Sequence, residues 1–126
     1  MKRFFYLISL TSFVSLLCTS CEKDKQLLDN TCNVTNPAEE LNWLKSIITE
    51  IEQSNQELSK QAYYMVAKYK GESVFYYGNC HPAINYVSHV INCKGDTLGA
   101  TNELDDELTD VNVLWKHEKS ECNFNK

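Results

Sequence analysis

The N-terminal segment most limits what this chain can fold into. We expect it to be cleaved off, so that only the remaining residues form the folded domain. Lys2 and Arg3 form a short positive end, and an almost uncharged apolar run of 14 residues, Phe4–Leu17, follows them. A run of this length is too short to cross a bilayer stably and is typical of the apolar core of a secretory signal peptide. We therefore expect residues 1–20 to be removed during export. About 105 of the 126 residues remain, which is enough for one hydrophobic core.

The residues at the end of this run resemble a lipobox, the motif at which bacterial lipoprotein signal peptides are cleaved. Thr19 and Ser20 are small and precede Cys21, whereas Cys18 stands where leucine is more usual. The resemblance implies that Cys21 is acylated, becomes the N-terminus of the mature chain and anchors it in a lipid bilayer. Two or three acyl chains, at about 0.8 kcal/mol per buried methylene, make such an anchor stable. The alternatives are an uncleaved anchor helix, or an ordinary signal peptide with a free cysteine nearby.

The charged stretch that follows Cys21 bears on where the anchored protein resides. Glu22–Lys25 resembles the region behind the acylated cysteine of Bacteroidota-type lipoproteins, where a charged stretch can direct export to the cell surface. Here the run mixes both signs instead of being purely acidic. The resemblance implies a protein anchored to the cell envelope, at the outer membrane, and leaves the periplasmic and the surface face both open.

The net charge of the mature chain excludes some partners. Cleavage removes Lys2 and Arg3 and no acidic residue, which leaves 10 basic and 17 acidic residues and a net charge of −7. A small domain with this charge is a poor candidate for binding nucleic acid or anionic lipid headgroups. We expect no nucleic-acid partner.

The mature chain keeps four cysteines besides Cys21, namely Cys32, Cys80, Cys93 and Cys122. An even number in a small exported domain is typical of two disulfides, and four cysteines allow three pairings. We favour Cys80–Cys93 with Cys32–Cys122, because the second bond would tie the two ends of the domain together. One straight strand over 84–93 would place Cys80 and Cys93 at opposite ends of a hairpin. This pairing therefore requires a bulge or a shorter strand.

A helix is predicted at the start of the folded domain. Residues 21–35 lack periodicity and predict a flexible tether, so the single domain is expected to span 36–126. Asn36 can cap a helix, Pro37 suits its first position, and Glu39 stands at the capping-box position. The apolar spacing predicts an amphipathic helix from 37 to about 53, with these residues on one face: Leu41, Leu44, Ile48 and Ile51.

From Gln61 onward the side chains alternate every second residue instead of following the helical spacing, and this alternation predicts strands. A first strand to Tyr69 turns at Lys70-Gly71 and returns over 74–77. Further strands are expected over 84–93, 97–100 and 111–116. The economical arrangement is a two-layer α+β domain, in which one N-terminal amphipathic helix packs on a four- to five-stranded antiparallel meander sheet. The sheet face away from the helix would then carry exposed tyrosines.

Tyrosines are the strongest candidates for a binding surface. Five of the seven tyrosines lie between residues 63 and 77. Tyrosine gives rigid, amphipathic contact area at low entropic cost, which suits contact with a protein or a glycan. The alternative is that these rings are cross-strand pairs that stabilise the hairpin. The candidate binding residues are Tyr63, Tyr64, Tyr76 and Tyr77.

Other polar residues give weaker signals. Cys80, His81, His89 and Cys93 lack the close ligand pairs of a zinc site, and disulfides explain the cysteines better in an oxidising compartment. No nucleophile–base pair is apparent, so no catalytic residue is assigned. Five carboxylates between residues 103 and 110 lack the glycine and spacing of an EF-hand, and a solvated acidic loop is favoured over calcium binding. We expect neither a metal nor another cofactor.

Three segments together resemble a group of small lipoproteins of the Bacteroidota type. They are Glu39–Lys45, the aromatic hairpin and Asn92–Gly95, and the resemblance covers about residues 36–116. It implies export and a compact α+β domain, and it transfers no catalytic residue. The expected function is that of a membrane-anchored envelope lipoprotein that binds a protein or a glycan without catalysis. A structural accessory subunit of an envelope complex is the alternative, and a small hydrolase ranks third.

Overall fold

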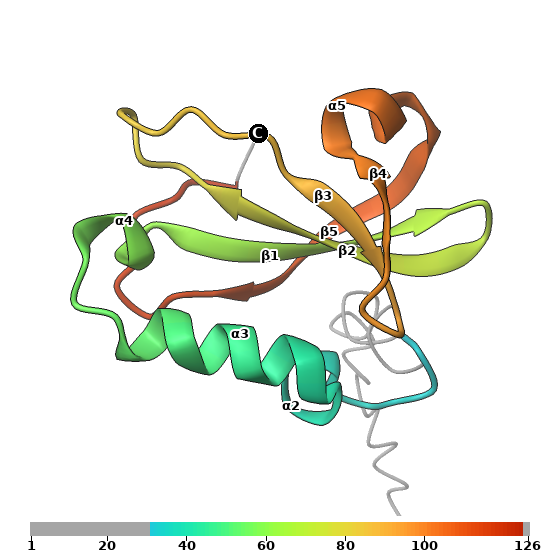
Figure 1. The fold of residues 1–126 in the computed structure, drawn as a ribbon, viewed down its shortest axis with the longest axis horizontal. Helices are drawn as coiled ribbons and strands as arrows, with labels where there is room; N and C mark the ends of the chain where they lie inside the picture. Colours follow the sequence, from blue (N-terminus) through green and yellow to red (C-terminus); the bar gives the residue numbers. More distant parts are fainter. Residues whose placement is uncertain (1–30, 125–126) are drawn as a thin grey trace, which may run out of the picture.

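A computed structural model describes residues 31–124 of the chain (Figure 1). The predicted signal peptide, the lipidated Cys21 and most of the predicted tether lie outside the described residues. The described chain contains three α-helices before the sheet, α2 (Pro37–Glu40), α3 (Asn42–Gln53) and α4 (Glu57–Lys60). It continues with β1 (Ala62–Tyr69), β2 (Glu72–Asn79), β3 (His89–Asn92), β4 (Thr97–Ala100), α5 (Thr101–Leu104), the 3-10 helix η1 (Asp105–Glu107) and β5 (Leu108–Lys116). Within these residues no helix is both long and apolar enough to span a membrane.

The five strands form one antiparallel sheet in the order β4-β3-β2-β1-β5, which confirms the predicted α+β class. The prediction of a continuous meander is wrong, because β5 returns to pair with β1 at the far side of the sheet. The chain between β4 and β5 makes this crossing over one sheet face. Leu104 and Leu108 pack there on a buried cluster of three residues from β1, β2 and β3: Ala67, Val74 and Val90.

The sheet is covered on both faces. On one face, α3 packs on Tyr64, Val66 and Phe75 through its buried Leu44 and Ile48 (Figure 1). The α5–η1 segment and the start of β5 lie over part of the opposite face. The expected open face of exposed tyrosines is therefore wrong, because burial of Leu104 and Leu108 draws the crossing segment onto that face.

The helical region differs from the prediction at its start. Leu41 is extended, with φ −81° and ψ 105°, and separates α2 from α3. Asn36 makes no side-chain cap; instead its backbone N–H donates to Glu40 Oε1 at 2.7 Å, so Glu40 and not Glu39 closes the first turn. The interruption allows Ala38 of α2 to join the same buried cluster as Leu44. Sequence periodicity could not show this break, because the apolar spacing continues through it.

Two further boundaries differ from the predicted strands. The third strand begins at His89, not at residue 84, and residues 80–88 form an irregular loop. The predicted acidic loop contains α5 and η1, and β5 begins at Leu108, not at 111. Pro82 has no N–H for a strand ladder, and the interactions of Tyr86 described below draw this loop toward β2.

The disulfides are Cys32–Cys93 and Cys80–Cys122, with Cα–Cα distances of 5.6 and 5.7 Å, so the favoured pairing of Cys80–Cys93 with Cys32–Cys122 is wrong. Cys80 follows the end of β2 and Cys93 follows the end of β3. Because these strands are antiparallel, the two residues lie at opposite ends of the sheet. Cys32 belongs to the segment predicted as tether, and its bond to Cys93 attaches residues 31–35 to the domain.

Candidate functional site

The four candidate tyrosines lie on two different faces of the sheet. Tyr64 and Tyr77 are cross-strand partners on the α3 face, with ring centroids 5.8 Å apart. Tyr64 is only 3% exposed, and this burial raises its pKa to about 12. Tyr63 and Tyr76 are half-buried on the opposite face, where Phe124 lies edge-on against Tyr63 at 4.9 Å. The tyrosines therefore act mainly in packing, and Tyr64 is inaccessible to a ligand.

A different part of the chain forms an uncharged surface. Residues Ser73–Cys93 contain no Asp, Glu, Lys or Arg, in a chain of which 23% is charged. Within this stretch the loop 81–88 leaves Tyr86 and Val87 exposed by 38% and 60%. Leu58 of α4 is 40% exposed, and its carbonyl oxygen accepts a hydrogen bond from the Asn79 amide at the end of β2. We call the loop 81–88 together with Leu58 and Tyr77 the edge surface. It combines exposed apolar side chains with an absence of charge.

Asn79 holds the edge surface together through four hydrogen bonds. Its backbone N–H donates to Tyr86 Oη at 2.6 Å, and its Oδ1 accepts the N–H of His81 at 2.9 Å. Its Nδ2 donates to the carbonyl oxygen of Leu58 at 2.7 Å and to Tyr77 Oη at 2.9 Å. The ring of Tyr86 also lies edge-on to that of Tyr77, with centroids 5.6 Å apart. Asn79 is buried, so its amide serves to join α4, β2 and the loop.

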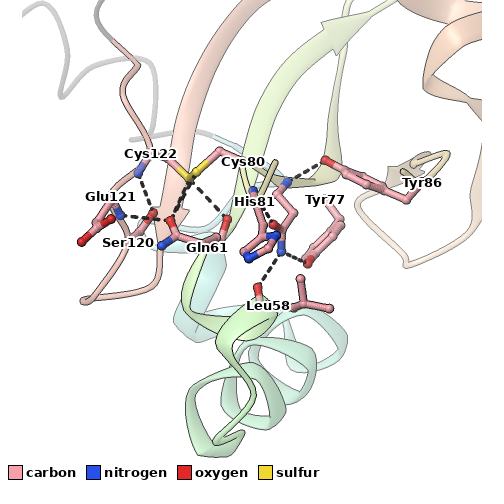
Figure 2. The surroundings of a disulfide bond; sticks show 10 residues. Leu58, Gln61, Tyr77, Cys80, His81, Tyr86, Ser120, Glu121 and Cys122 are labelled. Carbon is pink, nitrogen blue, oxygen red and sulfur yellow. Dashed lines mark hydrogen bonds between the residues drawn. A yellow bond between two sulfur atoms is a disulfide. The ribbon is translucent and has the colours of Figure 1, made fainter. Parts of the chain in front are cut away.

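The beginning of the loop is fixed by the C-terminal tail. Figure 2 shows Gln61 between the Cys80–Cys122 disulfide and the tail. The Gln61 carbonyl oxygen accepts the N–H of Cys80 at 3.2 Å, and its Oε1 accepts the N–H of Glu121 at 3.1 Å. The loop therefore starts at a position that both a covalent bond and backbone hydrogen bonds define.

The first turn of the loop and its end are also fixed. His81 Nδ1 accepts the N–H of Ala83 at 3.1 Å, and the His81 carbonyl oxygen accepts that of Ile84 at 3.1 Å, which forms a turn at Pro82. At the other end, the carbonyl oxygen of Ser88 accepts the N–H of Thr101 at 2.9 Å. Between these points the loop is held by the Tyr86 side chain, through its hydroxyl and its ring.

A shallow cavity of about 260 Å³ lies elsewhere, at the turn between β1 and β2. Its lining combines an aromatic ring, two charged groups, an amide and two aliphatic side chains, from Tyr69, Lys70, Glu72, Val74, Asn92 and Leu98. The Lys70 ammonium lies 4.9 Å from the Tyr69 ring centre and 3.9 Å from Glu107 Oε2. Tyr69 and Glu107 both raise the pKa of Lys70. The Lys70 ammonium therefore already interacts with two neighbouring side chains of the fold.

The predicted polar candidates do not converge. Cys80 and Cys93 belong to different disulfides, and His81 uses its Nδ1 within the loop. Among residues 31–124 no three His, Cys, Asp or Glu side chains lie close enough to hold a metal ion. The acidic residues 103–110 lie mostly exposed on α5, η1 and the start of β5.

Comparison with known proteins gives no relative from which residues could be transferred. No protein-family model, no curated protein and no solved structure matches the chain. The sequence patterns did not single out Leu58, Asn79 or Tyr86. Leu58 and Tyr86 lie outside the hairpin strands, and Asn79, the last residue of β2, belongs to no distinctive motif. The uncharged run from 73 to 93 is the signal that could have directed attention to them.

Proposed function

We propose that the chain is an exported, lipid-anchored binding domain of the cell envelope and has no catalytic role. The observation that carries the proposal is the edge surface, which is apolar, uncharged and attached at its start to the Cys80–Cys122 disulfide. The disulfide is typical of exported proteins, and the exposed apolar, uncharged area is typical of binding surfaces. Cys21 is the proposed lipidation site, and the proposed location is the outer membrane.

The cysteines support the export part of the proposal. Both disulfides join residues far apart in sequence, with separations of 61 and 42. Disulfides of this kind persist in oxidising compartments and stabilise small exported domains. The apolar run Phe4–Leu17 and the lipobox-like residues before Cys21 supply an export signal and an anchor in the same chain.

The hydrogen bonding of the edge surface supports binding over catalysis. Three of the groups there that could act as acid, base or nucleophile, His81 and the hydroxyl groups of Tyr77 and Tyr86, bond to neighbouring parts of the fold, and a fourth, the Ser88 hydroxyl, is buried. Their partners shape the loop. What the loop presents outward is mainly aliphatic and aromatic, and exposed apolar area of this kind is typical of an interaction surface.

Mass spectrometry of the natural mature protein tests the export and anchoring. We expect a species that lacks residues 1–20, carries acyl chains on Cys21, and has four cysteines oxidised as two disulfides. A Cys21→Ser variant is the control and should keep its precursor mass. Retention of Met1, an unmodified Cys21 or free thiols at the other cysteines would overturn the proposal.

A binding assay tests the second part. The mature lipoprotein in detergent is immobilised and exposed to detergent-solubilised envelope proteins and, separately, to envelope glycans. We expect saturable binding that an excess of the free lipoprotein removes. Absence of saturable binding in both arms would overturn the binding role, whatever the mass of the mature chain.

A further inference from the structure

We infer that the edge surface docks on a protein with an uncharged apolar groove, and that residues 82–87 enter this groove as a pre-shaped loop. The inference rests on the proposed function, since it names the partner class of the same binding domain. The observation behind the inference is that the exposed Tyr86 and Val87 lie next to the buried Asn79, whose backbone N–H donates to the Tyr86 hydroxyl.

The distribution of charge defines the partner. The uncharged loop is flanked by charged residues, Glu57 and Lys60 on α4 and Lys119 on the tail. Glu57 and Lys60 form an ion pair, and Lys60 lowers the pKa of Glu57. The result is an apolar centre with a charged rim, the usual anatomy of a protein interface. A charged group docked on the centre would lose hydration without gaining a counter-charge. The matching surface is therefore apolar and neutral.

The bracing of the loop favours affinity. A protein loses binding free energy when it must order a mobile segment on association. Here the disulfide at Cys80, the Tyr86–Asn79 hydrogen bond and the Ser88–Thr101 hydrogen bond fix the loop in the free protein. Tyrosine is enriched among residues that dominate binding energy, and Tyr86 stands beside the exposed Val87.

The same contacts favour a protein over a glycan. Recognition of a sugar needs polar groups directed at the ligand's hydroxyls, in addition to an aromatic ring. At the edge surface the Asn79 amide and the Tyr77 and Tyr86 hydroxyls bond to one another and to Leu58. Of the exposed side chains of residues 82–87, Pro82, Ala83 and Val87 offer no hydrogen bond, and Asn85 supplies one amide. An apolar protein groove matches these groups better.

Photo-crosslinking in native membranes locates the contact. The full-length lipoprotein carries benzoylphenylalanine in place of Val87, or, as a matched control, in place of Val111 on the edge strand β5. Both valines are exposed, by 60% and 44%. We expect a saturable crosslink to one protein from position 87 and none from position 111. Mass spectrometry then identifies that protein and the crosslinked segment, which should line an apolar groove.

Affinity measurements with the identified and purified protein decide whether the contact matters. Val87→Ser should weaken the Kd about 10-fold or more, as expected for a central apolar contact, and Val111→Ser should leave it within about 2-fold. Because both valines are exposed, neither variant should unfold, and circular dichroism verifies this.

Several results would overturn the inference. These are equal crosslinking from both positions, a glycan as the crosslinked species, or an unchanged Kd for Val87→Ser. If the immobilised lipoprotein binds an envelope ligand but position 87 gives no crosslink, the inference fails and the proposed function stands. If the lipoprotein binds nothing saturably, both fail.

Discussion

Tyr63 and Gly78 are cross-strand partners in β1 and β2, and the phenol ring of Tyr63 lies directly over the glycine. A methyl group placed on Gly78 would lie 2.1 Å from Cε2 of that ring, well inside van der Waals contact. Phe124 then packs edge-on against Tyr63, with ring centroids 4.9 Å apart. The absence of a side chain at residue 78 thus allows the C-terminal tail to pack on the sheet.

Gly78→Ala should therefore destabilise the domain. The ring of Tyr63 would have to rotate away and lose its contact with Phe124, at a cost of about 1–3 kcal/mol, the usual range for overpacking. Urea unfolding followed by circular dichroism measures the change. In a Tyr63→Ala background the obstacle is absent, so the added Gly78→Ala change should cost far less. An equal cost in both backgrounds would contradict the packing explanation.

Local patterns predicted the local structure well. The alternation that starts near Gln61 and the Lys70-Gly71 pair predicted the β1–β2 hairpin, which the structure confirms with φ values of 50° and 83° at the turn. This succeeded because a two-residue turn and its flanking strands depend only on neighbouring residues. The antiparallel α+β class followed from the same patterns.

Features that depend on distant parts of the chain could not be predicted in this way. The position of β5 beside β1 depends on Leu104 and Leu108 finding a buried cluster on the sheet. The disulfide pairing depends on which strand ends meet, and this follows only once the strand order is known. At the candidate site, the contacts of Asn79 could not be predicted for the same reason. Its partners Leu58 and Tyr86 lie 21 and 7 residues away, and no sequence period connects them.

Peptide mapping without reduction should yield two crosslinked pairs, Cys32 with Cys93 and Cys80 with Cys122. With loops of 61 and 42 residues, the chain-entropy relation gives each bond about 4 kcal/mol of stabilisation. Replacing both cysteines of either pair by serine should lower the free energy of unfolding by roughly this amount. Detection of a Cys80–Cys93 peptide in the native protein would contradict the pairing.

The two disulfide variants should also differ locally. Loss of Cys80–Cys122 should release the tail around Ser120–Cys122, which is tied to Gln61, and increase proteolytic cleavage there. Loss of Cys32–Cys93 should instead free the segment before α2. Limited proteolysis with mass spectrometry distinguishes the two sites, and the same cleavage pattern in both variants would contradict separate roles for the bonds.

Alkaline pH should unfold the domain partly through Tyr64. Burial raises the pKa of Tyr64 from its ordinary value of 10.0 to about 12, so the fold favours the neutral phenol. The stabilisation is complete below pH 10 and is lost as the pH rises through about 12, with a total near 2–3 kcal/mol. Tyr64→Phe cannot ionise and should lose less stability between pH 9 and pH 12. Unfolding curves across this range provide the measurement, and an identical pH dependence in both proteins would refute the assignment.

Tyr86→Phe should loosen the loop without removing its aromatic packing. The change deletes the hydroxyl that accepts the Asn79 N–H at 2.6 Å, while the ring can keep its position 5.6 Å from that of Tyr77. One lost hydrogen bond of about 1 kcal/mol should speed amide hydrogen exchange at Asn79 about 5-fold. Exchange at Val66, in the middle of β1, should stay unchanged and serves as the internal reference.

Because a looser loop must be ordered on association, the variant should also bind the proposed protein partner more weakly than the wild type, although it presents nearly the same apolar surface. Unchanged exchange at Asn79 would show that the Tyr86 hydroxyl does not brace the loop.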